Sequence, residues 1–478
     1  MIDAKTLTLE QLLQIEDEPA LLDYTCEHTG VPIWALIRTE CLWALIDQIH
    51  YRQTSGPAPA VRTQRIERAR TLGRSLLHNV VRRQLRGSIC LMPSGIANTL
   101  IDGRWFNRLS GHFANCAAEH TVVVEDQFCW QWRSPKHFEH TLLHAPLAEA
   151  ARVVGKLRLG SSHKRVASQL VEIVSARARQ HFDWEIPKAT RDGVAAELAM
   201  RVAEAPVLFD IHRALFRRLG TKLLLKEDGC FSSSSVIVRA ARSLGVTTAE
   251  YQHGIVSPGH YAYNVAPALR RSDQYQQTLP EHFLAYGSWW NEQINVPLAK
   301  LAVGNPHQAE RIRTVKPKAD AQDRVLVLGA GIDTRNYVAF AARIAQALKS
   351  RGLRVVLRPH PVERAQLEAI HQSGDQDVEI DPDRDVYESL AGVNAVIAET
   401  STVLFEAVGL AKRIFSWDTD RARFALPVHP FQRFSEVEEV IALLEAADTG
   451  SVSAGVDSIW CPEWRDNYLR FLADSGVA

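Results

Sequence analysis

From Arg324 to Trp417 short apolar runs alternate with amphipathic stretches, at lengths that fit strands and helices in turn. The apolar runs lie at 325–328, 355–357, 378–380, 395–398 and 414–417, and helical patterns at 336–351, 364–371, 387–391 and 403–410 separate them. Strict alternation of strands and helices implies a parallel, doubly wound sheet. The predicted fold class is therefore α/β.

Two of these runs end in polar groups suited to an anionic ligand. Arg358-Pro359-His360-Pro361 follows 355–357, and Glu399-Thr400-Ser401-Thr402 follows 395–398. Ligands of open α/β sheets bind outside the carboxyl ends of strands, and a helix start attracts phosphate. Both motifs also have explanations without a ligand. A helix capping box explains part of the spacing between the hydroxyl residues and the following glutamate, and X-Pro pairs end many strands that bind nothing. The predicted donor-binding residues are Arg358, His360, Pro361, Thr400, Ser401, Thr402 and Glu406.

Strand and helix patterns also alternate earlier in the chain. At 478 residues the chain is too long for a single hydrophobic core. Strands are expected at 88–92, 121–124, 222–225, 247–251, 282–286 and 300–303, with a helix from Trp105 to Ala118. We expect an N-terminal helical region at 1–86 and a first Rossmann-like domain at 87–318. A second such domain follows at 319–460, and a helix at 461–478 packs back on the first domain.

Candidates for a catalytic base follow two strands of the first domain. Glu227-Asp228-Gly229 comes after 222–225, and Gln252-His253-Gly254 comes after 247–251. A carboxylate or an imidazole at a strand end can accept a proton from a substrate. An acid in a first helical turn and a hydrogen-bonded turn histidine explain the same residues without catalysis. Glu227, Asp228 and His253 all remain candidates.

Composition excludes several classes of function. Lysine plus arginine equals aspartate plus glutamate, 55 each, so no charge excess predicts nucleic-acid binding. Seven scattered cysteines without a C-x-x-C pair predict neither a disulfide framework nor a zinc site. No run is apolar for eighteen residues, and the first residues lack the pattern of a signal peptide. A cytoplasmic protein is therefore expected.

Basic residues gather in two stretches. Residues 61–86 hold eight arginines against one acid, Glu67, interleaved with apolar residues, and a second group lies at 156–165. These stretches predict either peripheral contact with the anionic inner face of the cytoplasmic membrane or an ordinary solvated helix face.

The ordered set of an acidic-acidic-Gly triplet, a His-Pro and Ser/Thr residues resembles bacterial GT-B glycosyltransferases of surface and capsular polysaccharide biosynthesis. It is most similar to the type that uses CMP-activated sugars such as sialic acid or Kdo. The resemblance implies that Glu227 or Asp228 is the base, that His360 contacts the donor and stabilises the leaving group, and that Thr400, Ser401 and Thr402 hold the donor phosphate. It covers residues 220–420.

The activity that follows is inverting transfer from a nucleotide sugar to a glycan or lipid-linked glycan acceptor, as in capsule or lipopolysaccharide synthesis. We expect neither a metal nor another cofactor. His253-Gly254 is instead similar to the CDP-polyol phosphate transferases of teichoic acid synthesis, in which such a histidine is the base. A UDP- or GDP-hexose transferase, a sugar-nucleotide epimerase and a non-catalytic scaffold are compatible with the same fold.

Overall fold

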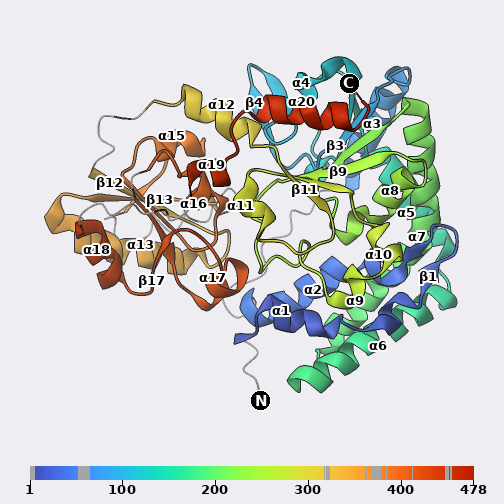
Figure 1. Cartoon of the computed structure of the whole chain (residues 1–478), viewed down its shortest axis with the longest axis horizontal. Helices are drawn as coiled ribbons and strands as arrows, with labels where there is room; N and C mark the ends of the chain where they lie inside the picture. The colour runs from blue at the N-terminus through green and yellow to red at the C-terminus, as the bar shows by residue number, and fades with distance from the viewer. Residues whose placement is uncertain are drawn as a thin grey trace.

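The computed structural model shows two α/β domains side by side, joined near residue 318 (Figure 1). It describes residues 6–51, 65–316, 318, 323–360, 363–364, 367, 378–383, 385–411, 413–446, 452 and 455–477. Both large sheets are parallel, so the expected α/β fold with two Rossmann-like domains of the GT-B kind is confirmed.

The first domain is built on a seven-stranded sheet with the order β11-β10-β9-β8-β3-β6-β7. Its central strands are buried along their whole length, as is typical of a parallel sheet covered on both faces. The strands are β3 (Ile89–Met92), β6 (Thr121–Glu125), β7 (Thr141–Leu143), β8 (Leu223–Lys226), β9 (Thr247–Tyr251), β10 (His282–Ala285) and β11 (Ala299–Ala302). All but the edge strand β7 were expected.

Helices surround this sheet, and the N-terminal segment packs against one side of it (Figure 1). The long helices are α3 (Arg65–Val81), α5 (Ala145–Arg158), α6 (Ser161–Phe182) and α7 (Lys188–Leu219), and the shorter ones are α1 (Leu9–Leu12), α2 (Arg38–Ile46), α4 (Gly111–Cys116), α8 (Ser235–Arg242), α9 (Pro267–Arg270), α10 (Asp273–Gln276), α11 (Ser288–Asn291) and α12 (Pro306–Thr314). A two-stranded ribbon, β1 (Thr25–Cys26) with β2 (Val31–Pro32), precedes α2.

The helix expected from Trp105 to Ala118 is wrong in its first half. Strands β4 (Asn98–Ile101) and β5 (Arg104–Asn107) form an antiparallel hairpin, and only α4 is helical. The hairpin turn is Asp102-Gly103, whose φ angles of 48° and 74° are those of a tight two-residue turn. An Asp-Gly pair is a hairpin signal, and it outweighs the helical spacing of the apolar residues.

The second domain has a six-stranded parallel sheet with the order β14-β13-β12-β15-β16-β17. Its strands are β12 (Arg324–Leu328), β13 (Arg354–Arg358), β14 (Glu379–Ile380), β15 (Ala395–Ala398), β16 (Arg413–Trp417) and β17 (Gln432–Phe434), and its helices are α13 (Thr334–Leu348), α15 (Val386–Leu390), α16 (Thr402–Glu406), α17 (Asp420–Ala425) and α18 (Val437–Glu445). Helix α16 is shorter than the predicted 403–410. Most of the helix predicted at 364–371 lies outside the described residues.

The chain returns to the first domain at its end. After α19 (Val456–Ile459), helix α20 (Trp464–Asp474) crosses the first domain (Figure 1). Tyr468 is fully buried there, with its ring centroid 4.8 Å from that of Phe113. No described helix is both long enough and apolar enough to cross a bilayer.

Candidate functional site

Glu227, the first acid of the triplet after β8, points into the protein. Its carboxylate accepts hydrogen bonds from the Ser94 amide (3.0 Å), the Ser94 hydroxyl (2.5 Å) and the Tyr251 hydroxyl (2.9 Å). The residue is 1% exposed. A carboxylate that is buried and bonded in this way fixes the loop after β3 to the ends of β8 and β9.

Asp228, the next residue, points the opposite way and meets His253. The distance from His253 Nε2 to Asp228 Oδ1 is 3.0 Å, and the two side chains are 21% and 33% exposed. Asp228 adopts a left-handed conformation with φ of 57°. The ends of β8 and β9 therefore present a histidine–carboxylate pair, and Asp228 is its more exposed member.

A second carboxylate lies behind the imidazole. Glu250 Oε1 is 3.7 Å from His253 Nδ1, and Glu250 is fully buried. The Glu250 carboxylate accepts hydrogen bonds from the Cys230 amide (2.8 Å) and the Tyr263 hydroxyl (2.7 Å). The imidazole is thus held between two acids. Glu250 was missed in the sequence, although an acid inside a buried strand three residues before a candidate histidine was a usable signal.

The two acids keep a proton on His253. Burial opposes the charged imidazole, but the charge and hydrogen bond of Asp228, and the charge of Glu250, raise the pKa of His253 to about 9. Burial opposes the charged form of Asp228 as well, yet His253 lowers the pKa of Asp228 to about 2. At neutral pH the pair is therefore an imidazolium and a carboxylate, and it titrates as one unit. In this state only the Asp228 carboxylate has oxygen lone pairs that can accept a proton, because the imidazolium has none.

The loop that follows His253 is braced by the N-terminal segment. Arg38 and Glu16, which are 1% and 0% exposed, form an ion pair with an Nε to Oε2 distance of 2.7 Å. Arg38 also donates to the carbonyls of Tyr261 (2.7 Å) and Asn264 (2.6 Å). A buried arginine is stable only when its donors are satisfied in this way. Glu16 and Arg38 of the N-terminal segment thus hold the loop in place.

The same loop touches the second domain. The Ser257 hydroxyl donates to the carbonyl of Ala425 in α17 (2.6 Å). A Cβ on Gly259 would lie 1.9 Å from the carbonyl oxygen of Phe424, so only glycine permits this approach. The pair Asp228–His253 therefore lies on the side of the first domain that faces the second.

On the second domain, Glu399 is part of the scaffold. Tyr337 and Thr419 donate to its carboxylate, and Arg421 forms a buried ion pair with it, with an Nε to Oε1 distance of 2.9 Å. Ser401 caps α16 by accepting from the Val403 amide (3.2 Å). Thr400, Ser401 and Thr402 are all half-buried. Their role as phosphate ligands stays a prediction.

Arg358 is the last residue of β13, next to β12 in the same sheet, and His360 follows two residues later. Nη1 of Arg358 bonds Asp381 Oδ2 (2.5 Å), the Asp383 carbonyl (2.8 Å) and Ser389 Oγ (2.8 Å), so this nitrogen is not available to a phosphate. Burial lowers the pKa of His360, which keeps its imidazole neutral at neutral pH. Pro361 lies outside the described residues.

An aromatic cluster joins α16 to the first domain. The ring centroids of Trp290 and Phe405 are 4.4 Å apart, and Trp460 donates its indole N–H to the Phe405 carbonyl (3.0 Å). Trp290 and Phe405 are fully buried. Glu406, the residue after Phe405, is thereby held at the boundary of the two domains.

Tyr286 connects the two halves of the site. Its amide donates to Gln252 Oε1 (2.9 Å), next to His253 in the chain. Burial and the charge of Glu406 raise the pKa of Tyr286, and Arg108 opposes this shift. Burial likewise raises the pKa of Glu406, against the charge of Arg108. Arg108 is exposed, and its guanidinium has no carboxylate within ion-pair distance among the described residues. No local pattern marked Arg108 as a site residue.

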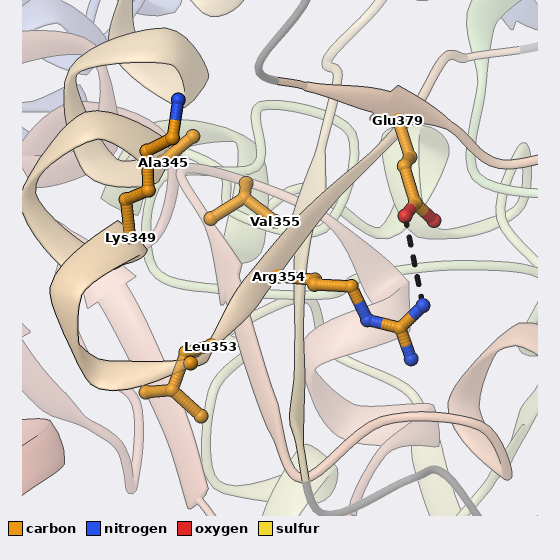
Figure 2. Close-up of a pocket in the computed structure, with 7 residues that line it drawn as sticks. Ala345, Lys349, Leu353, Arg354, Val355 and Glu379 are labelled. Carbon is orange, nitrogen blue, oxygen red and sulfur yellow. Dashed lines mark ion pairs between the residues drawn. The ribbon is translucent and has the colours of Figure 1, made fainter.

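The described residues contain no group of three or more His, Cys, Asp or Glu placed to hold a metal ion. A pocket between α13 and β13 contains the Arg354–Glu379 ion pair of 3.8 Å (Figure 2). It opens at the amino end of β13, away from His360, so it is separate from the candidate site.

Comparison with known proteins gives structural likenesses only. No protein-family model and no curated protein matches the sequence. Similar solved structures include a UDP-GlcNAc 2-epimerase from Methanocaldococcus jannaschii, with 10% identity, a TM-score of 0.43, and coverage of 81% of this chain and 99% of that one. The wall teichoic acid polymerase TagF has 11% identity and a TM-score of 0.38, covering 86% and 93%. The glycotransferase of kitacinnamycin has 12% identity and a TM-score of 0.39, covering 82% and 96%. The roles of single residues rest on the geometry of this chain.

Proposed function

We propose that the chain is a nucleotide-sugar-dependent transferase in which Asp228 is the base. The observation that carries this proposal is the 3.0 Å contact of Asp228 with His253 at the ends of β8 and β9. Asp228 is the more exposed member of the pair and holds the free lone pairs. His253, as an imidazolium, orients Asp228 and keeps it ionised.

The reaction is a displacement at the anomeric carbon of the donor. Asp228 takes the proton of an acceptor hydroxyl, whose oxygen forms a bond to the anomeric carbon. The bond from that carbon to the phosphate oxygen breaks, and its electron pair leaves with the nucleotide. With a single base, the configuration is inverted. The burial of Glu227 and the three hydrogen bonds that its carboxylate accepts favour Asp228 over Glu227 as the base.

The donor nucleotide binds at the boundary between α16 and the first domain. Glu406 accepts a hydrogen bond from the ribose, and the Ser401 hydroxyl donates to a phosphate oxygen. Arg108 and His360 are placed to receive the negative charge of the leaving phosphate. The preferred donor is a CMP-activated ulosonic acid such as Kdo or sialic acid, and the acceptor is a surface-polysaccharide or lipid-linked glycan.

A thermal-shift screen of CMP, CDP, UDP and GDP tests the donor half. At a hundredfold excess over its dissociation constant, a bound nucleotide should raise the melting temperature by about 3 °C, because it binds only the folded state. CMP should give the largest shift. A larger shift with CDP would favour a CDP-polyol donor, and one with UDP or GDP a hexose transferase or an epimerase.

Two variants locate the nucleotide in the same screen. Ser401→Ala and Glu406→Gln should each reduce the shift, whereas Glu119→Gln, which changes an exposed glutamate just before β6 at the amino ends of the strands, should keep it. A protein that shows no shift with any of the four nucleotides would contradict the proposed function.

A further inference from the structure

Helix α3 exposes its large apolar residues, while the two residues of the helix that are buried, Thr71 and Ser75, are polar. Five apolar side chains are between 50% and 70% exposed: Ile66, Leu76, Leu77, Val80 and Val81. Thr71 and Ser75, on the opposite face, are 4% and 0% exposed. At 100° per residue the five apolar side chains form one stripe about 140° wide, the width that normally faces a protein core. This stripe faces outward.

The buried face of α3 is held by polar contacts to the edge of the first sheet. Asn79 exchanges two hydrogen bonds of 2.8 Å with the backbone of Leu143 in β7. Ser75 donates to Gln127 (2.9 Å), and Thr71 donates to the carbonyl of Trp130 (2.8 Å). These bonds fix the rotation of the helix about its axis. The apolar stripe therefore cannot turn inward without breaking them.

Positive charge surrounds the stripe. Arg74, Arg83 and Arg86 are exposed and have no ion-pair partner among the described residues. The nearby Glu67 is paired with Arg70 at 2.8 Å. A second basic group, Lys156 and Arg158, flanks the 83% exposed Leu157 on the neighbouring helix α5. An outward apolar stripe with cationic flanks matches the interface of an anionic bilayer.

We propose that α3 docks on the headgroup region of an anionic lipid bilayer. The stripe enters the boundary between headgroups and acyl chains, and the arginines pair with lipid phosphates. A second copy of the chain is the competing occupant, but two such stripes would bring the same unpaired arginines together, which is unfavourable. The proposal does not depend on the catalytic function.

Co-sedimentation of the full chain with lipid vesicles tests the proposal. The wild type should pellet with vesicles of phosphatidylglycerol and phosphatidylcholine, and much less with phosphatidylcholine alone or in high salt. Arg74→Gln/Arg83→Gln/Arg86→Gln should weaken binding to the anionic vesicles by about a hundredfold, at roughly fivefold per arginine. Leu77→Gln/Val80→Gln/Val81→Gln should weaken it at least about tenfold, because less apolar surface enters the interface.

Matched controls carry the same changes on other surfaces. Val428→Gln/Leu469→Gln and Arg271→Gln/Arg465→Gln/Arg470→Gln alter exposed residues away from α3, and should pellet like the wild type. The α3 variants alter only exposed side chains, so their melting temperatures should stay at the wild-type value. Equal pelleting of wild type and both α3 variants would overturn the proposal. The proposal would also be overturned if light scattering without lipid showed the wild type to be a dimer and the Leu77→Gln/Val80→Gln/Val81→Gln variant to be a monomer.

Discussion

Asp228→Asn should lower the rate of sugar transfer by about 10²- to 10⁴-fold, the usual contribution of a general base. The amide cannot accept the proton of the acceptor hydroxyl, although it has nearly the shape of the carboxylate. Folding and the nucleotide-induced thermal shift should remain, because Asp228 is 33% exposed and belongs to the acceptor half of the site. Initial rates of nucleotide release, with the donor chosen by the thermal-shift screen, measure the effect.

The chain contains a matched control for this change. His28 and Asp210 form another histidine–carboxylate contact of 3.0 Å, with side chains that are 49% and 58% exposed. Asp210→Asn should therefore leave the transfer rate unchanged. A wild-type rate for Asp228→Asn, or an equal loss in both variants, would contradict the role of Asp228.

Arg38→Met should lower the free energy of unfolding by about 3–5 kcal/mol, because it leaves the buried Glu16 charge without a partner. It also removes the two hydrogen bonds that Arg38 donates to the Tyr261 and Asn264 carbonyls. The loop after His253 would then lose its brace, so the transfer rate should fall as well. Urea unfolding followed by tryptophan fluorescence measures the loss of stability.

Two further variants separate the buried pair from a general loss of charge. Glu16→Gln/Arg38→Met should be more stable than Arg38→Met alone, since no unpaired charge is left in the interior. Arg179→Met removes an arginine that is 42% exposed and pairs with Glu172 and Glu185, so it should cost much less stability than Arg38→Met, because exposed ion pairs contribute little. If Arg38→Met were no more costly than Arg179→Met, the brace would be refuted.

The sheets and the strand-end motifs could be predicted because they follow from local patterns. Buried parallel strands are short apolar runs, and polar residues that follow them meet at one edge of the sheet. The alternation from Arg324 onward therefore predicted five strands of the second domain. The edge strands β7 and β17 are short and partly polar or flanked by loops, so periodicity alone did not reveal them.

The choice of the base among Glu227, Asp228 and His253 depended on where each side chain points. Glu227 and Asp228 lie beyond the end of β8, where strand alternation does not fix the direction of a side chain. Glu227 faces inward because Ser94, in the loop after β3, and Tyr251, at the end of β9, donate hydrogen bonds to its carboxylate. Arg38 contacts carbonyls more than 220 positions away, so no local pattern indicates the brace. Tyr286 and Glu406 meet only through the packing of Trp290 on Phe405.

The dependence of the transfer rate on pH tests most directly whether Asp228 is the base held by a charged His253. The active form needs Asp228 ionised, which holds above its pKa of about 2, and His253 protonated, which holds below its pKa of about 9. The initial rate should therefore be level from about pH 5 to 8 and should fall as the pH rises through 9, and His253→Gln should lack this alkaline fall. A rate that instead rises with pH up to 9 would make neutral His253 the base and would contradict the assignment of Asp228.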